Sequence, residues 1–223
     1  MTVVLHTCCG PCASACVPRL AADGQEVMML FANSNIDTRE EFEKRKAEAE
    51  KLAKHDGVRF VALPYDHAEW LREVAAGYEN EPEKGKRCAR CFRYNLAKTA
   101  AFAREHGIES FTTSLTVSPH KVSSMIFSAA SDLSTPQPRN PATSQPRNLS
   151  TSQLLNPATS QPRNLATSQP RNPATSQLRN PATFLPYDFK KREGFKLSVK
   201  RAEELGLYRQ SYCGCEFSKR KID

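Results

Sequence analysis

The chain has 223 residues, 39% of them hydrophobic, which suffices for one sizeable core or two small ones. Its 32 Lys and Arg against 24 Asp and Glu give a formal charge of +8, compatible with an anionic partner but far from histone-like. The sequence lacks a run of about 20 apolar residues, which excludes a membrane-spanning helix. The apolar residues 2–5 lead directly into cysteines, unlike a secretion signal, so we expect a cytoplasmic protein.

Strand patterns alternate with helix patterns through most of the chain. Buried strands are expected at residues 2–6, 25–33, 58–63 and 110–115. Helices are expected at residues 39–55, after a capping-box pattern at Thr38 and Glu41, and at 67–76, 87–106, 121–130 and 195–205. This alternation predicts an α/β fold, with a mostly parallel sheet covered by helices on both faces.

An octapeptide repeat, with units such as NPATSQPR and NLATSQPR, occupies residues 132–183. A unit this polar buries too little apolar surface to offset its conformational entropy, so we expect a disordered insertion. The simplest origin is an expanded DNA repeat, although its five arginines leave open a basic tether for nucleic acid. The predicted organisation is therefore an α/β core at 1–131, the insertion at 132–183 and a C-terminal segment at 184–223.

Eight cysteines fall into three groups that are far apart in the sequence. They are Cys8, Cys9, Cys12 and Cys16, then Cys88 and Cys91, and finally Cys213 and Cys215. In a chain without an export signal, such groups indicate metal ligation or redox chemistry more than a disulfide framework. Separate groups suggest convergence on one site in space.

Cys8 and Cys9 follow the first predicted strand, at the sheet edge where α/β proteins bind ligands. Adjacent cysteines rarely pair with each other because the disulfide geometry is strained, so this pair is predicted to ligate a metal or cluster. The alternative is that both are small buried apolar residues. Cys16 is expected in the core beside Val17 and Leu20.

Cys88 and Cys91 form a C-x-x-C pair at the start of a predicted helix, so both lie on one face. The motif alone fits a thioredoxin-like pair, half a zinc site or half an iron–sulfur site. The absence of a strand leading directly into it disfavours thioredoxin. With Cys8 and Cys9 it supplies four thiolates, and their spacing does not decide between structural zinc and a [4Fe–4S] cluster.

Cys213 and Cys215 are separated only by Gly214, which allows a tight, strained ring. Strained disulfides are labile and often catalytic, so we predict a redox-active pair. Ligation of the same metal and inert packing are the alternatives.

Several motifs together resemble the epoxyqueuosine reductase QueH family. They are LHTCCGPC at the start, the Cys88/Cys91 pair, TTSL followed by SPHK at 112–121, FLPYDFKK at 184–191 and YRQSYCGCEFS at 208–218. The resemblance covers nearly the whole chain outside 132–183, and the repeats there depart from the family pattern. It implies a Rossmann-like core of the HUP type and reduction of epoxyqueuosine to queuosine at the tRNA wobble position.

By the same resemblance, Cys8, Cys9, Cys88 and Cys91 would ligate a [4Fe–4S] cluster, and Cys213 and Cys215 would be the redox-active pair. Cys12 is a candidate ligand of a second iron. The electron donor is not identified.

Substrate contacts are predicted at three further residues. Ser114 lies at a strand end, His120 is a candidate proton donor, and Tyr212 is one of several aromatic residues available to stack on tRNA bases. The basic residues expected to contact tRNA phosphates are Lys190, Lys191, Arg192, Lys196, Lys200, Arg201, Lys219, Arg220 and Lys221. The alternative for these basic residues is an ordinary solvated helix face.

Two other functions remain open from the sequence. One is a zinc-stabilised module that binds a nucleotide or tRNA without redox chemistry. The other is an ATP-dependent tRNA thiolation enzyme, which is disfavoured because Cys-Cys-Gly-Pro-Cys replaces the Ser-Gly-Gly-x-Asp-Ser pyrophosphate loop after the first strand. Iron and sulfide analysis separates the zinc module from an iron–sulfur enzyme.

Overall fold

The computed structural model describes residues 1–131, 133 and 181–219. Five parallel strands form one sheet in the order β3-β2-β1-β4-β5. The strands are β1 (Thr2–His6), β2 (Glu26–Phe31), β3 (Arg59–Ala62), β4 (Ser110–Thr113) and β5 (Thr183–Phe184). This all-parallel sheet with its helices confirms the predicted α/β fold class, and its strand order is that of a Rossmann-type sheet.

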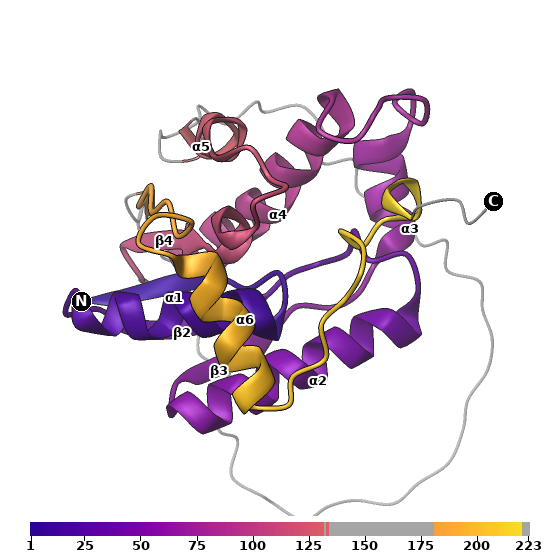
Figure 1. Cartoon of the computed structure of the whole chain (residues 1–223). Coiled ribbons are helices and arrows are strands. Elements are labelled where there is room, and N and C mark those ends of the chain that lie inside the picture. The colour runs from indigo at the N-terminus through magenta and orange to yellow at the C-terminus, as the bar shows by residue number, and fades with distance from the viewer. Residues whose placement is uncertain (132, 134–180, 220–223) are drawn as a thin grey trace, which may run out of the picture. The chain divides into compact units, whose positions relative to one another are not determined.

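The helices lie on both faces of the sheet, as Figure 1 shows. The α-helices are α1 (Gly10–Ala22), α2 (Arg39–Asp56), α3 (His67–Trp70), α4 (Lys86–Glu105), α5 (Ser123–Ser131) and α6 (Gly194–Glu204). A π-helical turn (Leu71–Ala75) continues α3, and 3-10 turns follow β4 (Ser114–Val117) and precede the C-terminus (Glu216–Ser218). Among the described helices, none combines the length and apolar character needed to cross a membrane.

The period-two pattern of the strands explains the two cores. Val3 and Leu5 of β1 face the core built with α1, α2 and α6. Val4, between them, faces the opposite core, built with α4 and α5. Successive side chains of a strand point to opposite faces, so a continuous apolar run is buried on both sides.

Local signals account for the helix ends closest to the site. Cys9 is the N-cap of α1, where its sulfur accepts from the Cys12 amide, and a proline follows in the first turn. Thr38 caps α2 by accepting from the Glu41 amide at 3.2 Å, as the capping pattern predicts. The Glu41 carboxylate accepts from Arg45 in the next turn, at 2.7 Å.

The C-terminal segment joins the same sheet as the N-terminal core. β5 pairs with β4 through Thr183 and Phe184, and α6 packs against α1. Most of the predicted 132–183 insertion lies outside the described residues, so its organisation stays a prediction.

Candidate active site

The first cysteine group lies at the carboxyl ends of β1 and β4. The strand order reverses direction between these two strands, which is where open α/β sheets bind ligands. The Cys8 amide donates to the Ser114 hydroxyl at 3.0 Å, so the turns after the two strands are tied together. The fold therefore places the vicinal cysteines at the switch point of the sheet, in the crevice where open α/β proteins bind ligands.

Three sulfurs gather tightly in this crevice. The Sγ atoms of Cys8, Cys9 and Cys12 all lie within 4.8 Å of one another. Cys9 is buried, while Cys8 and Cys12 are partly accessible. Cys12, predicted only as a candidate ligand of a second iron, therefore belongs to the same tight group as Cys8 and Cys9.

The three thiols differ in pKa. Hydrogen bonds from Cys12 and Cys9 hold the pKa of Cys8 well below its usual range, and Ser114 contributes to the same shift. A hydrogen bond from Cys12 lowers the pKa of Cys9, yet the adjoining Cys8 and burial raise it to about 12. The low pKa of Cys8 favours its thiolate form, which is the form that binds metals.

The other two cysteine groups meet in one cavity. Cys88 and Cys91, from the first turns of α4, line it together with Cys213 and Cys215 from the C-terminal segment. A second cavity is lined by Cys8, Cys91 and Cys213. Cys91 and Cys213 line both cavities, so residues from all three cysteine groups border this region.

The sulfurs of the four predicted ligands all accept hydrogen bonds. Cys8 accepts from the Ser114 hydroxyl at 3.3 Å, and Cys9 from the Cys12 amide at 3.4 Å. Cys88 accepts from the Lys84 amide at 3.3 Å, and Cys91 from Asn95 Nδ2 at 3.7 Å.

Cys16 behaves differently, because its sulfur donates to the Cys12 carbonyl at 3.4 Å. Burial also raises the pKa of Cys16 well above its usual range. It lies in the core with α1, as predicted, and is a neutral thiol.

This donor set fits a thiolate-bound metal. Metal-bound thiolates are hydrogen-bond acceptors that need donors around them, and the four sulfurs have such donors. The described cysteines are all free thiols, so their sulfurs are available for ligation. The Cys8, Cys9 and Cys12 group is the one set of three compact enough to hold a single ion among the described residues.

Lys121 contributes a positive charge to the same crevice. It lines the second cavity beside Cys8 and Cys213. Burial disfavours its charged form, but the neighbouring sulfur groups of Cys213 and Cys8 outweigh burial and raise its pKa above the usual range. The lysine therefore stays cationic beside these sulfurs. The SPHK motif was the sequence signal that contained it.

Three residues were predicted to contact substrate. The Ser114 hydroxyl both accepts from the Cys8 amide and donates to the Cys8 sulfur, so it holds the cysteine turn. The Tyr212 hydroxyl donates to Asp37 at 2.7 Å. His120 is exposed, in the loop before α5. Their roles toward a substrate stay predictions.

His6, the last residue of β1, is fully buried, with Nδ1 2.9 Å from the Thr113 hydroxyl. Burial lowers the pKa of His6 to about 4, so its ring is neutral at pH 7.

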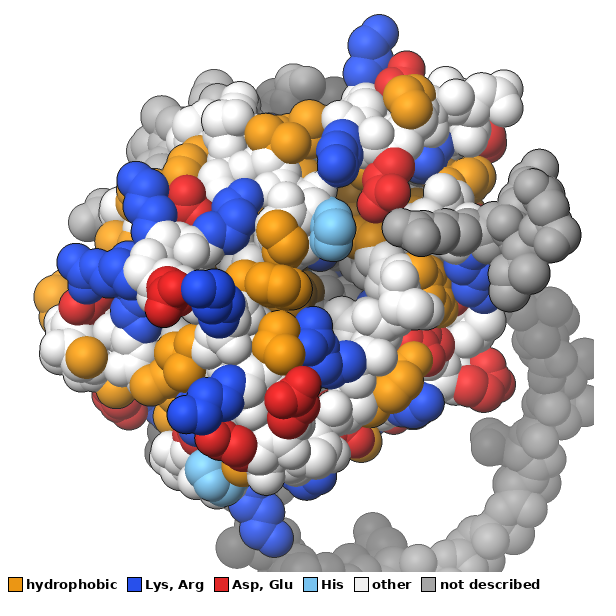
Figure 2. Space-filling view, viewed as in Figure 1, with side chains coloured by type: hydrophobic (Ala, Val, Ile, Leu, Met, Phe, Trp, Pro, Cys, Tyr) orange, Lys and Arg blue, Asp and Glu red, His pale blue; other side chains and the backbone are white. Residues whose placement is uncertain are grey.

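The predicted basic surface is partly engaged in contacts within the protein. Arg201 pairs with Asp56 at 2.7 Å and donates to the Ser14 carbonyl, which makes it a packing residue of α6. Lys190 donates to the Lys121 carbonyl at 2.6 Å, next to the site. Figure 2 shows Lys and Arg side chains spread over this face, with acidic and hydrophobic side chains between them.

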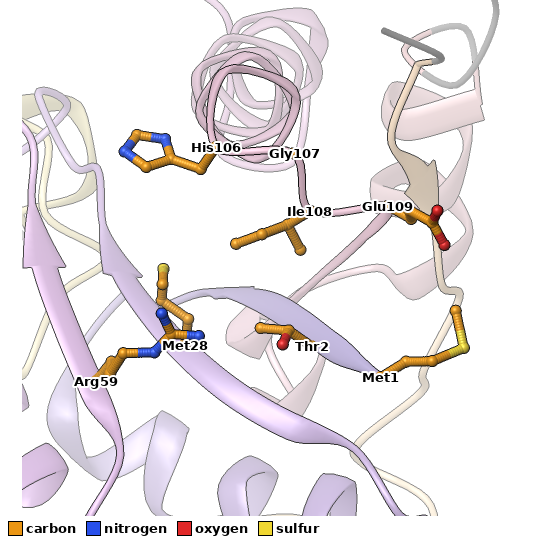
Figure 3. A pocket seen from close by; sticks show the side chains of 8 residues that line it. All are labelled: Met1, Thr2, Met28, Arg59, His106, Gly107, Ile108 and Glu109. Carbon is orange, nitrogen blue, oxygen red and sulfur yellow. The ribbon is translucent and has the colours of Figure 1, made fainter.

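A larger hollow of about 420 Å³ lies at the opposite edge of the sheet. Thr2 and Arg59, the first residues of β1 and β3, line it together with His106 after α4, as Figure 3 shows. It contains no cysteine and lies at the amino ends of the strands. The candidate active site therefore lies in the smaller, cysteine-lined cavities at the carboxyl ends of the strands.

Comparisons with known proteins place the chain in one family. The family model described as "Epoxyqueuosine reductase QueH" matches residues 3–149 and 147–221. A curated relative of that name from Streptococcus pyogenes is 30% identical over 223 residues, covering 97% of this chain and 70% of the relative. One from Thermotoga maritima is 28% identical over 97% of this chain and 90% of the relative. One from Haemophilus influenzae is 38% identical over 119 residues, which is 53% of this chain and 48% of the relative.

Proposed function

Because the chain belongs to the epoxyqueuosine reductase QueH family, we propose that it reduces epoxyqueuosine to queuosine at the wobble position of tRNA. One observation of the structure carries the proposal beyond family membership. Cys213 lines one cavity with Cys8 and Cys91 and another with Cys88, Cys91 and Cys215. A dithiol that donates two electrons, placed beside sulfurs that can bind a metal, supplies the groups that a reductive deoxygenation requires.

The chemistry balances with the groups of this chain. Conversion of an epoxide to an alkene releases the oxygen as water and consumes two electrons and two protons. The Cys213 and Cys215 thiols supply both when they join in a disulfide. An external reductant must then return the disulfide to two thiols before the next turnover.

For the metal centre, we propose that Cys8, Cys9, Cys88 and Cys91 hold a [4Fe–4S] cluster and that Cys12 is available to a second iron. When bound, the cluster supplies single-electron transfer and an iron that acts as a Lewis acid. Ser114 orients Cys8 through two hydrogen bonds. Lys121 offsets the negative charge that four thiolates bring into a partly buried crevice.

The substrate is a tRNA, which carries a dense negative charge and is found in the cytoplasm. Segment 184–223 completes the site in this proposal, since it provides both redox cysteines and basic residues such as Lys190 beside the crevice. His120 is exposed near the crevice and is retained as a candidate contact to the anticodon loop. The formal charge of +8 is consistent with such a partner.

The test is an anaerobic turnover assay on tRNA that contains epoxyqueuosine, followed by nucleoside mass spectrometry. The reconstituted protein with a chemical reductant is expected to yield queuosine, lighter by one oxygen atom. A tRNA with an unmodified anticodon serves as the control and should be unchanged. Failure to convert the epoxide nucleoside with a fully loaded metal centre would contradict the proposal.

A further inference from the structure

Arg45 is a buried arginine that the cysteine chemistry does not account for. It lies in the second turn of α2 and is 2% exposed. Burial of a cation is strongly unfavourable unless its donors are satisfied. The partners of Arg45 therefore indicate what the charge does.

The guanidinium joins helix α2 to the C-terminal segment. Its Nε donates to Glu41 at 2.7 Å within the helix. Its Nη1 donates to the Cys213 carbonyl at 3.0 Å, and its Nη2 lies 3.5 Å from the Tyr212 carbonyl. The planar fork of an arginine suits two adjacent carbonyls in a way that the single ammonium of lysine does not.

The backbone around the redox pair is held on both sides. The Gly214 carbonyl accepts from the Asp37 amide at 3.0 Å, and the Gly214 amide donates to the Ser218 hydroxyl at 3.3 Å. Gly214 has a φ of +139°, and a Cβ there would stand 3.2 Å from Arg45 Nη1 and 3.1 Å from Asn35 Nδ2. Three consecutive carbonyls, of residues 212, 213 and 214, are thus fixed against α2 and the loop before it.

We infer that Arg45 is a positioning residue for the reaction. It holds the Cys213 backbone so that Cys213 faces the other cysteines. Arg45 and Cys213 line the same cavity as Cys8 and Cys91. Release of the Cys213 carbonyl frees the loop to carry its sulfur away from that cavity. The inference rests on the proposed function, because it gives Arg45 a role only if the Cys213 and Cys215 pair transfers electrons.

The test compares Arg45→Gln and Arg45→Lys with the wild-type holoenzyme. Arg45→Gln is expected to lower kcat at least tenfold, while the KM for tRNA stays within twofold and iron and sulfide contents are unchanged. Arg45→Lys keeps the positive charge but lacks the planar guanidinium, so its kcat should lie between those of the wild type and Arg45→Gln. Hydrogen exchange of the Asp37 amide, whose acceptor is the Gly214 carbonyl, should be faster in Arg45→Gln.

Arg19 offers a matched control, because its guanidinium also donates to two carbonyls, those of Asp188 and Lys191. Arg19→Gln should lower thermal stability and leave kcat within twofold. If Arg45→Gln does not fold, Gly214→Ala disturbs the same contact from the loop side and should give the same loss of kcat.

An unchanged kcat in folded Arg45→Gln or in Gly214→Ala would overturn the inference. A rise in the KM for tRNA without a fall in kcat would also overturn it. Cys213→Ser separates this failure from failure of the proposed function. If Cys213→Ser is inactive while Arg45→Gln is normal, only the role of Arg45 is wrong. If Cys213→Ser turns over normally, the proposed redox pair itself fails.

Discussion

Each predicted ligand sulfur accepts a hydrogen bond from a neighbouring group. The donors are a hydroxyl for Cys8, backbone amides for Cys9 and Cys88, and a side-chain amide for Cys91. Such donors fix the orientation of ligands and stabilise negative charge on sulfur. The division between these four cysteines and the C-terminal pair leads to two predictions about single residues.

The first concerns the redox pair. Cys213→Ser and Cys215→Ser are each expected to keep full iron and sulfide content but to abolish reduction of epoxyqueuosine in tRNA. Thiol–disulfide exchange needs both sulfurs, so either single change should be as damaging as the double change. Metal analysis and the tRNA assay provide the measurements. Loss of the cluster in either variant would show that the pair are ligands, and normal turnover in both would leave them as packing.

The second concerns Asn95, which is 3% exposed and whose Oδ1 has no hydrogen-bond partner. Both of its amide protons are used, toward Asn35 and the Cys91 sulfur. Asn95→Leu removes the donor to sulfur and is expected to make the reduction potential of the iron–sulfur centre more negative. A redox titration followed by electron paramagnetic resonance measures this potential. An unchanged potential at unchanged iron content would count against Cys91 as a ligand.

At the scale of elements, α1 determines the geometry of the crevice. Its first residue, Gly10, passes so close to α2 that a Cβ would lie 2.7 Å from the Glu48 carbonyl oxygen and 2.9 Å from its carbon. These are backbone atoms, which cannot rotate away. Gly10→Ala is therefore expected to lower the free energy of unfolding by about 1–3 kcal/mol. Urea denaturation of the apoprotein measures it, and an unchanged midpoint would mean that the helices separate without cost.

Most elements were predictable because their apolar periods are strong. The expected β1 matches the structure, and α4 begins and ends one residue earlier than predicted. β5 was not predicted as a strand: it has two residues, and its pairing with β4 cannot be inferred from so short a pattern. No bounds were predicted for α1, whose sequence contains two cysteines and a second proline, Pro18, in its interior.

The candidate site was predictable as a set of cysteines but not as an arrangement. Sequence spacing grouped Cys8 with Cys9, yet it could not show that Cys12 lies within 4.8 Å of both. It gave no indication of Arg45 or Asn95, because a buried arginine and asparagine on amphipathic helices resemble surface residues in one sequence. Contacts between elements far apart in the chain determine their roles, and such contacts leave no local pattern.

At the scale of the whole molecule, the repeat segment separates two parts of one sheet. β4 lies before it and β5 after it, and the two strands pair. Replacement of residues 134–180 by a short linker, which leaves Leu133, Ala182 and strand β5 in place, should leave thermal stability nearly unchanged. The cost of closing a loop changes by only about 0.6 kcal/mol per doubling of its length. Thermal unfolding of the shortened protein checks this, and insoluble protein would show that the repeats are structural.

The identity of the metal centre, iron–sulfur cluster or zinc, distinguishes a reductase from a zinc-stabilised binding module. We expect that protein purified and reconstituted without oxygen contains about four iron and four sulfide per chain, held by Cys8, Cys9, Cys88 and Cys91. Exchange of Cys8, Cys9, Cys88 or Cys91 for Ala should lower both contents. The most direct measurement is iron and sulfide analysis of the wild-type protein. Iron and sulfide near these values would support an iron–sulfur reductase, whereas stoichiometric zinc without sulfide would contradict it.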